Sequence, residues 1–219
     1  TADVFTSNIN RIHIMRHTVI SPDGQYVAYQ SYDVREWANY GHVFVKNLET
    51  EQIYEVGKLV TPMAYMRFLE DNTLVIVSSR GVIYHVPPEK LDVEEDEPYT
   101  ITQIEEVQLT TDHQINTSNM TLSSDGGLAA LWDCENYNVL QLQCEKASLH
   151  LWDITNQQVI IELDDPTFAQ PGYIDFSADG QQLAFSVCVD VEQINDYQSR
   201  CLKSEVRIYH VAQLQTGEN

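Results

Sequence analysis

The sequence predicts an all-β fold made of four copies of one unit. A turn of similar sequence recurs about every 50 residues. Apolar runs flank each turn, and Asp-Gly or Asp-Asn within it favours a tight hairpin because Gly and Asn tolerate a positive φ. Hairpin repeats of this length are typical of β-propeller blades. The four turns are Ser21-Pro22-Asp23-Gly24, Leu69-Glu70-Asp71-Asn72, Ser123-Ser124-Asp125-Gly126 and Ser177-Ala178-Asp179-Gly180.

Each turn joins two predicted strands. The strands that precede the turns are short, at residues 18–20, 64–68, 120–122 and 173–176. The strands that follow are nearly continuous apolar runs, at 26–30, 74–77, 128–132 and 183–187. Continuous apolar runs suit strands that are buried on both faces, so we expect these second strands in the middle of each blade.

Third strands alternate apolar with polar residues, which is the pattern of a strand with two different faces. They are expected at 43–48, 82–86, 149–154 and 206–211, and fourth strands at 53–56, 101–108 and 158–163. We therefore expect four four-stranded antiparallel blades in one domain over residues 1–219. Approximate blade limits are 15–60, 61–110, 115–165, and 170–219 plus 1–5.

The fourth copy has no fourth strand of its own. Residues Thr1 to Phe5 precede the first repeat much as 158–163 precede the fourth. One interpretation is that this N-terminal strand completes the last blade and closes a ring, which would remove exposed sheet edges. The other is that the chain is a segment of a longer propeller and that the strand comes from sequence not present.

The turn and strand pattern resembles a known repeat. Ser21-Pro22-Asp23-Gly24-x-x-Val27-Ala28-Tyr29, followed by residues 43–50, resembles the WD40-like repeat of TolB-type propellers and of prolyl-oligopeptidase-family propeller domains. Residues 149–153 are similar to the strand that ends in the Trp-Asp signature of WD40 propellers, although the other copies lack that signature. The resemblance covers nearly the whole chain and implies the propeller fold. It implies no function, because this scaffold hosts many tasks.

The composition is strongly acidic. Twelve Lys and Arg residues against 33 Asp and Glu residues give a formal net charge of −21. A field of that sign repels phosphate backbones and anionic lipid headgroups. No apolar run approaches the about 18 residues that span a bilayer. We expect no nucleic-acid partner and no membrane insertion.

Four cysteines occupy equivalent places in the third and fourth repeats. Cys134 and Cys188 each follow the Asp of the turn by nine residues, and Cys144 and Cys201 each precede the third strand by five. The second and third strands are hydrogen-bonded neighbours, whose Cα separation is close to what a disulfide tolerates. We predict disulfides Cys134–Cys144 and Cys188–Cys201, each closing the neck of a long loop.

Two other interpretations of the cysteines stay open. A structural zinc site would favour two Cys residues with two to four residues between them, and that spacing is absent. Buried free thiols are common in cores. The disulfide hypothesis implies an oxidising compartment, either periplasmic or extracellular.

Three long connections, at 32–42, 134–148 and 188–205, are expected on one face of the propeller. Aromatic residues stand among their polar residues, and rigid rings on such connections suit protein recognition. The alternative is that the rings pack onto their own blade. The candidate binding residues are Trp37, Tyr40, Tyr137 and Tyr197.

No catalytic or cofactor motif is present in this sequence. It lacks a Gly-x-Ser-x-Gly elbow, a phosphate loop and a dinucleotide fingerprint, and the Asp-Gly turns lack the alternating carboxylates of a calcium loop. We expect no catalytic residue, no metal and no cofactor. The leading hypothesis is a non-catalytic, exported propeller that acts as a protein-binding or assembly module through its long-loop face.

Two alternative functions stay open. The chain could gate access to the separate catalytic domain of a prolyl-oligopeptidase-type hydrolase, a role that rests on the resemblance. It could also be a structural subunit that associates with copies of itself through open blade edges.

Overall fold

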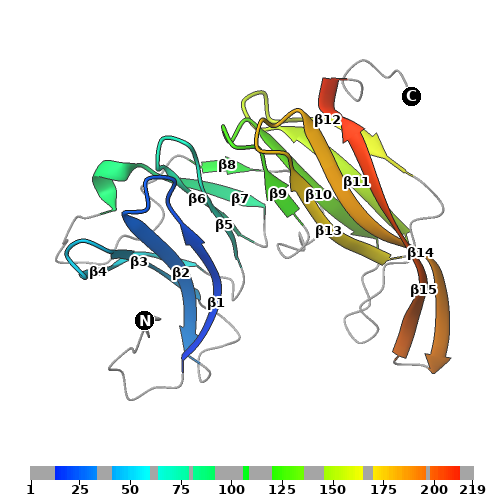
Figure 1. Ribbon diagram of the computed structural model, residues 1–219, viewed down its shortest axis with the longest axis horizontal. Helices are drawn as coiled ribbons and strands as arrows, with labels where there is room; N and C mark the ends of the chain where they lie inside the picture. Colours follow the sequence, from blue (N-terminus) through cyan, green and yellow to red (C-terminus); the bar gives the residue numbers. More distant parts are fainter. Residues whose placement is uncertain are drawn as a thin grey trace.

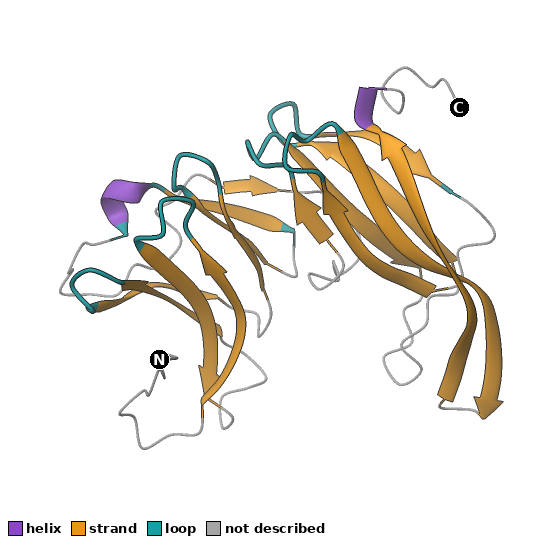
Figure 2. Cartoon of the chain, in the orientation of Figure 1, coloured by secondary structure: helices purple, strands orange, loops and turns teal. Residues whose placement is uncertain are grey.

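The structure, a computed structural model, describes nine segments of the chain: residues 13–33, 41–59, 64–78, 81–91, 106–108, 120–135, 146–164, 170–195 and 198–212. Within these segments the chain forms fifteen strands in four antiparallel sheets, together with one short 3₁₀ helix and a helical piece at residues 211–212 (Figure 2). Each sheet is one blade, and Figure 1 shows the blades following one another in an arc.

Blades 1 and 2 each contain four strands in sequence order. The strands of blade 1 are β1 (His13–Ile20), β2 (Tyr26–Asp33), β3 (Gly41–Asn47) and β4 (Ile53–Leu59). In blade 2 the 3₁₀ helix η1 (Pro88–Lys90) follows the third strand. The strands of blade 2 are β5 (Ala64–Phe68), β6 (Leu74–Ser78), β7 (Val82–Val86) and β8 (Glu106–Gln108).

Blade 3 has four strands and blade 4 has three among the described residues. The strands of blade 3 are β9 (Met120–Leu122), β10 (Leu128–Glu135), β11 (Lys146–Asp153) and β12 (Gln158–Leu163). Blade 4 has the order β13-β14-β15, so β15 is an edge strand of the described sheet. These strands are β13 (Gln170–Phe176), β14 (Gln182–Asn195) and β15 (Gln198–His210).

The predicted strand order is confirmed, and four strands have the predicted limits: β5, β7, β9 and β12. The main difference lies in the last repeat, where the sequence predicts a long loop over 188–205. Most of that segment is instead strand, because β14 and β15 continue past the blade as a paired ribbon. The predicted closing strand at Thr1 to Phe5 lies outside the described residues.

Three of the four turns share one hydrogen-bonded structure. In the first, the Ser21 hydroxyl donates to Asp23 Oδ1 over 2.6 Å, and the backbone N–H of Gln25 donates to the same oxygen over 2.9 Å. Gly24 follows in the left-handed region, at φ 72°. The bonds to Asp23 hold the pKa of this carboxyl below its ordinary value, with the serine hydroxyl as the largest cause. The same bonds and the same direction of shift recur at Asp125 and Asp179.

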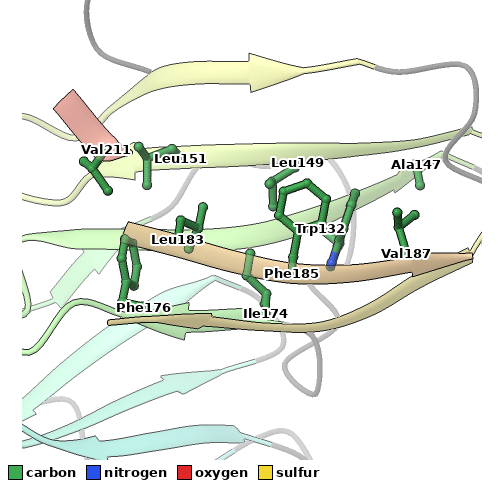
Figure 3. Close-up of a cluster of buried hydrophobic side chains, with 11 residues drawn as sticks. Trp132, Ala147, Leu149, Leu151, Ile174, Phe176, Leu183, Phe185, Val187 and Val211 are labelled. Carbon is green, nitrogen blue, oxygen red and sulfur yellow. The ribbon is translucent and has the colours of Figure 1, made fainter. Parts of the chain in front are cut away.

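The core of the described molecule consists of three apolar layers, each lying between adjacent blades. Figure 3 shows the layer between blades 3 and 4, where Trp132 meets Phe185 edge-to-face with ring centroids 5.3 Å apart. Leu149 and Leu151 of β11 lie in this layer and are almost fully buried. None of the three clusters joins blade 4 to blade 1, so the described blades form an open arc.

Removal of a side chain from this layer should be costly, whereas the matched removal from the uncovered blade should not. Leu149→Ala should lower the free energy of unfolding by about 2–5 kcal/mol, because it leaves a cavity under blade 4. Val206 holds the equivalent place on β15 but is 73% exposed, against 1% for Leu149. Within a single, dissociated chain, Val206→Ala should therefore change the free energy of unfolding by less than about 0.5 kcal/mol. Urea unfolding of both variants measures the contrast, and equal effects would contradict the layered core.

The aspartates of the turns should make stability depend on acidic pH. Hydrogen bonds from the serine hydroxyls hold the folded pKa values of Asp125 and Asp179 below the ordinary value of an aspartate carboxyl. The ionised aspartates therefore add to the free energy of unfolding at pH values above the unfolded pKa. This added stability is lost as the pH falls through the folded pKa. Ser123→Ala and Ser177→Ala remove the hydroxyl that donates to the aspartate. These variants should therefore lose less stability when the pH falls. Urea unfolding at pH 7, 4 and 2.5 tests it, with Ser204→Ala as an exposed serine control.

Candidate functional site

The most distinctive surface element is the ribbon that extends blade 4. We call residues 189–195 and 198–203 the hairpin arm. Figure 1 shows the arm running past the other strands of its blade. Its backbone stays paired to the tip, with partners Glu192 and Arg200, and then Asn195 and Gln198.

A disulfide ties the base of the arm to the blade. The Cys188 and Cys201 sulfurs are 2.11 Å apart and their Cα atoms are 5.8 Å apart, which confirms the predicted pair. The two residues are not ladder partners: Cys188 lies opposite Ser204, and Val191 lies opposite Cys201. The register between β14 and β15 shifts around Asp190, which lies between these two pairs of residues. The bond therefore joins neighbouring strands, as predicted, but between residues that are not directly opposite each other in the irregular ladder.

The arm carries exposed apolar side chains beside an ion pair. Ile194 is 56% exposed and Leu202 is 53% exposed. Arg200 pairs with Glu192 across the two strands. An isolated two-stranded hairpin is only marginally stable in water, so the disulfide supports a ribbon with which no third strand of the described residues pairs. The arm thus presents apolar side chains on a covalently anchored platform.

A group of polar residues links the first strands of three blades, namely β5, β9 and β13. Arg67 on β5 donates to the carbonyl oxygen of Leu122 over 2.5 Å and lies 3.9 Å from the Asp175 carboxylate on β13. The Thr121 hydroxyl donates to the same carboxylate over 2.9 Å. Each bond joins residues more than 50 positions apart, so sequence reasoning missed the group. These contacts hold blades 2, 3 and 4 together.

None of the four predicted binding residues belongs to the part of the chain that the structure describes. Trp37, Tyr40, Tyr137 and Tyr197 all lie outside the described residues. Of the second predicted cysteine pair, Cys134 ends up near the end of β10 with its backbone opposite Ala147, while Cys144 lies outside the described residues. Its pairing stays a prediction.

No metal-binding group and no membrane-crossing helix is found in the described segments. No cluster of three or more His, Cys, Asp or Glu residues there is arranged to hold a metal ion. No helix in them is long and apolar enough to cross a bilayer.

The comparisons with known proteins support a fold and no family. No family model matches the chain, and no curated protein matches it. Among solved structures, it is similar to TolB from Acinetobacter baumannii, with 19% identity and a TM-score of 0.51 over 78% of this chain. It is also similar to the β-propeller domain of the trilobed protease from Pyrococcus furiosus, with 14% identity and a TM-score of 0.52 over 90% of this chain.

A third similar structure is an oligogalacturonate lyase in complex with manganese, with 7% identity and a TM-score of 0.53 over 82% of this chain. The chain spans 37%, 55% and 48% of the lengths of these three proteins, in the order given. Identities this low support the fold alone. They confirm the resemblance to TolB-type and protease propellers at the level of the β-propeller fold.

Loss of the disulfide should loosen the arm. In the chain-entropy account, a bond across a separation of 13 residues stabilises the folded chain by about 3 kcal/mol. The double variant Cys188→Ser/Cys201→Ser should lose a stability of this order and should exchange the amide protons of the arm faster. Urea unfolding and hydrogen exchange measure both effects, with Ile194→Ser as a polar control that keeps the bond. Unchanged exchange in the arm would show that the bond does not order it.

Proposed function

We propose that this chain is a non-catalytic β-propeller module that binds a protein partner through the long-loop end of its blades. The observation that carries the proposal is the disulfide-anchored hairpin arm with exposed Ile194 and Leu202. The partner contributes an apolar pocket that receives these side chains.

Physical chemistry supports an anchored arm as a recognition element. Exposed apolar side chains mark interaction sites when they gather into a patch, and Ile194 and Leu202 supply exposed apolar surface on one ordered element. Ordering a loop upon binding costs free energy, and a ribbon that is already paired and cross-linked avoids much of that cost. The Arg200–Glu192 pair adds a polar rim to the apolar contact, as in most protein interfaces.

The same bond supports an oxidising location. Disulfides persist in the periplasm and the extracellular space and are rare in the cytosol. The chain itself carries none of the nucleophile, phosphate or dinucleotide motifs of an enzyme. We therefore place the module outside the cytosol, as a binding component.

Site-directed photo-crosslinking in cells that make the protein natively tests the proposal. A photoreactive benzoylphenylalanine in place of Ile194 or Leu202 should give one protein adduct of defined mass. The same residue in place of Leu48 is the matched control, because Leu48 is also exposed but lies at the turn after β3, far along the chain from the arm. An adduct as strong from position 48, or none from 194 and 202, would contradict the proposal.

The disulfide should matter for the same contact. Adding Cys188→Ser/Cys201→Ser to the photoreactive chain should reduce the adduct at least about fivefold, because the loosened arm must be ordered on binding. An unchanged yield of the adduct would show that binding does not require the disulfide at the base of the arm.

A further inference from the structure

The outer face of blade 4 is a blade-packing surface that no described blade covers. It faces away from blade 3 and comprises Tyr173, Ala184, Ser186, Val206 and Ile208. Ala184 lies opposite Ile208 in the ladder, and Ser186 lies opposite Val206. Tyr173 is 84% exposed and Ile208 is 63% exposed. Exposed apolar side chains thus gather on one side of this sheet.

The equivalent face of blade 3 shows that this face of the repeat packs against the next blade. Ala130 follows the turn serine of blade 3 by as many residues as Ala184 follows that of blade 4, and its ladder partner Leu151 matches Ile208. The pair of Trp132 and Leu149 matches Ser186 and Val206 in the same way. In blade 3 all four side chains are buried under blade 4 (Figure 3).

Blade 1 carries the complementary half of such an interface. On the face away from blade 2, Val27 and Tyr29 hold the places that Leu183 and Phe185 hold on blade 4. The ring of Tyr29 stacks on Phe44 with centroids 5.5 Å apart, and Ile20 beside them is 63% exposed. Their counterparts on blade 4 pack against blade 3. Val27 is only 5% exposed within one chain, so Ile20 supplies the exposed apolar surface on this face of blade 1. One chain therefore carries positions equivalent to both halves of the contact that its blades make with each other.

We propose that the outer face of blade 4 binds the outer face of blade 1 of a second copy of this chain, head to tail. Two such contacts would join the four described blades of each chain into a ring of eight, which lies within the usual range of four to eight blades. A heterologous contact closes into a ring when the rotation that it imposes returns to the start, and the described blades of one chain already follow one another in an arc (Figure 1). This contact is separate from the hairpin arm and does not rest on the proposed function.

The oligomeric state of the 219-residue chain tests the inference. Light scattering after size exclusion, across a dilution series at about 0.5 M salt to screen the net charge of −21, should give twice 25.1 kDa. The variant Val206→Asp/Ile208→Asp should raise the dissociation constant at least about 100-fold, because it buries two charges in the contact. Ile194→Asp on the arm is the matched control and should stay dimeric, although it should abolish the crosslink of the proposed function.

A mixing experiment tests the head-to-tail arrangement. Ile20→Asp alone should also give a monomer, since it damages the other half of the contact. Mixing it with Val206→Asp/Ile208→Asp should restore a dimer, because one undamaged face remains on each chain. Circular dichroism and an intact Cys188–Cys201 bond confirm that the variants fold.

Two results would overturn the inference. A dimeric Ile20→Asp variant would mean that blade 4 pairs with something other than blade 1. A monomeric wild-type chain at every concentration would exclude a second copy and would leave a further blade of the same polypeptide as the occupant of this face.

Discussion

The burial of each blade against the next is the constraint on which the rest of this structure depends. A four-stranded sheet of this repeat has apolar side chains on both faces, so a single blade cannot bury its own core. Burial of Trp132 and Leu149 under blade 4 shows the solution, and the same kind of layer recurs between blades 1 and 2 and between blades 2 and 3. No described blade covers the outer face of blade 1 or of blade 4 in this arc.

The polar residues of the repeat hold the layers in register. The Ser-x-Asp-Gly turns satisfy several of their own backbone donors, and the backbone N–H of Asp23 donates to Asn72 Oδ1 of the neighbouring turn over 3.4 Å. Gly126 shows how closely these turns approach each other. A Cβ atom built there would lie 2.8 Å from Leu69 Cδ1, so the turn of blade 3 packs directly on the turn of blade 2. Arg67 then bridges the inner strands, where the blades converge.

The hairpin arm departs from this scheme, because it extends past the other strands of its blade, and among its described residues only Val189, at its base, packs against the layer between blades 3 and 4. Its order must come from its own ladder, from ion pairs such as Arg200 with Glu192, and from the covalent bond at its base. A binding element and an assembly surface then occupy different parts of blade 4. The arm extends from the long-loop end of the sheet, whereas Tyr173, Val206 and Ile208 cover its outer face.

The sequence by itself determined the local structure: the turns, the strand order and the cysteine pair at the base of the arm. These follow from short-range patterns, namely a positive φ at Gly or Asn, period-two alternation and repeat spacing. Only the tertiary structure decided which faces are covered and that residues 188–205 form a paired ribbon. Leu149 and Val206 are similar in chemistry and in repeat position, yet one is buried and the other exposed. The difference depends on whether a neighbouring blade is present, and no local pattern encodes that.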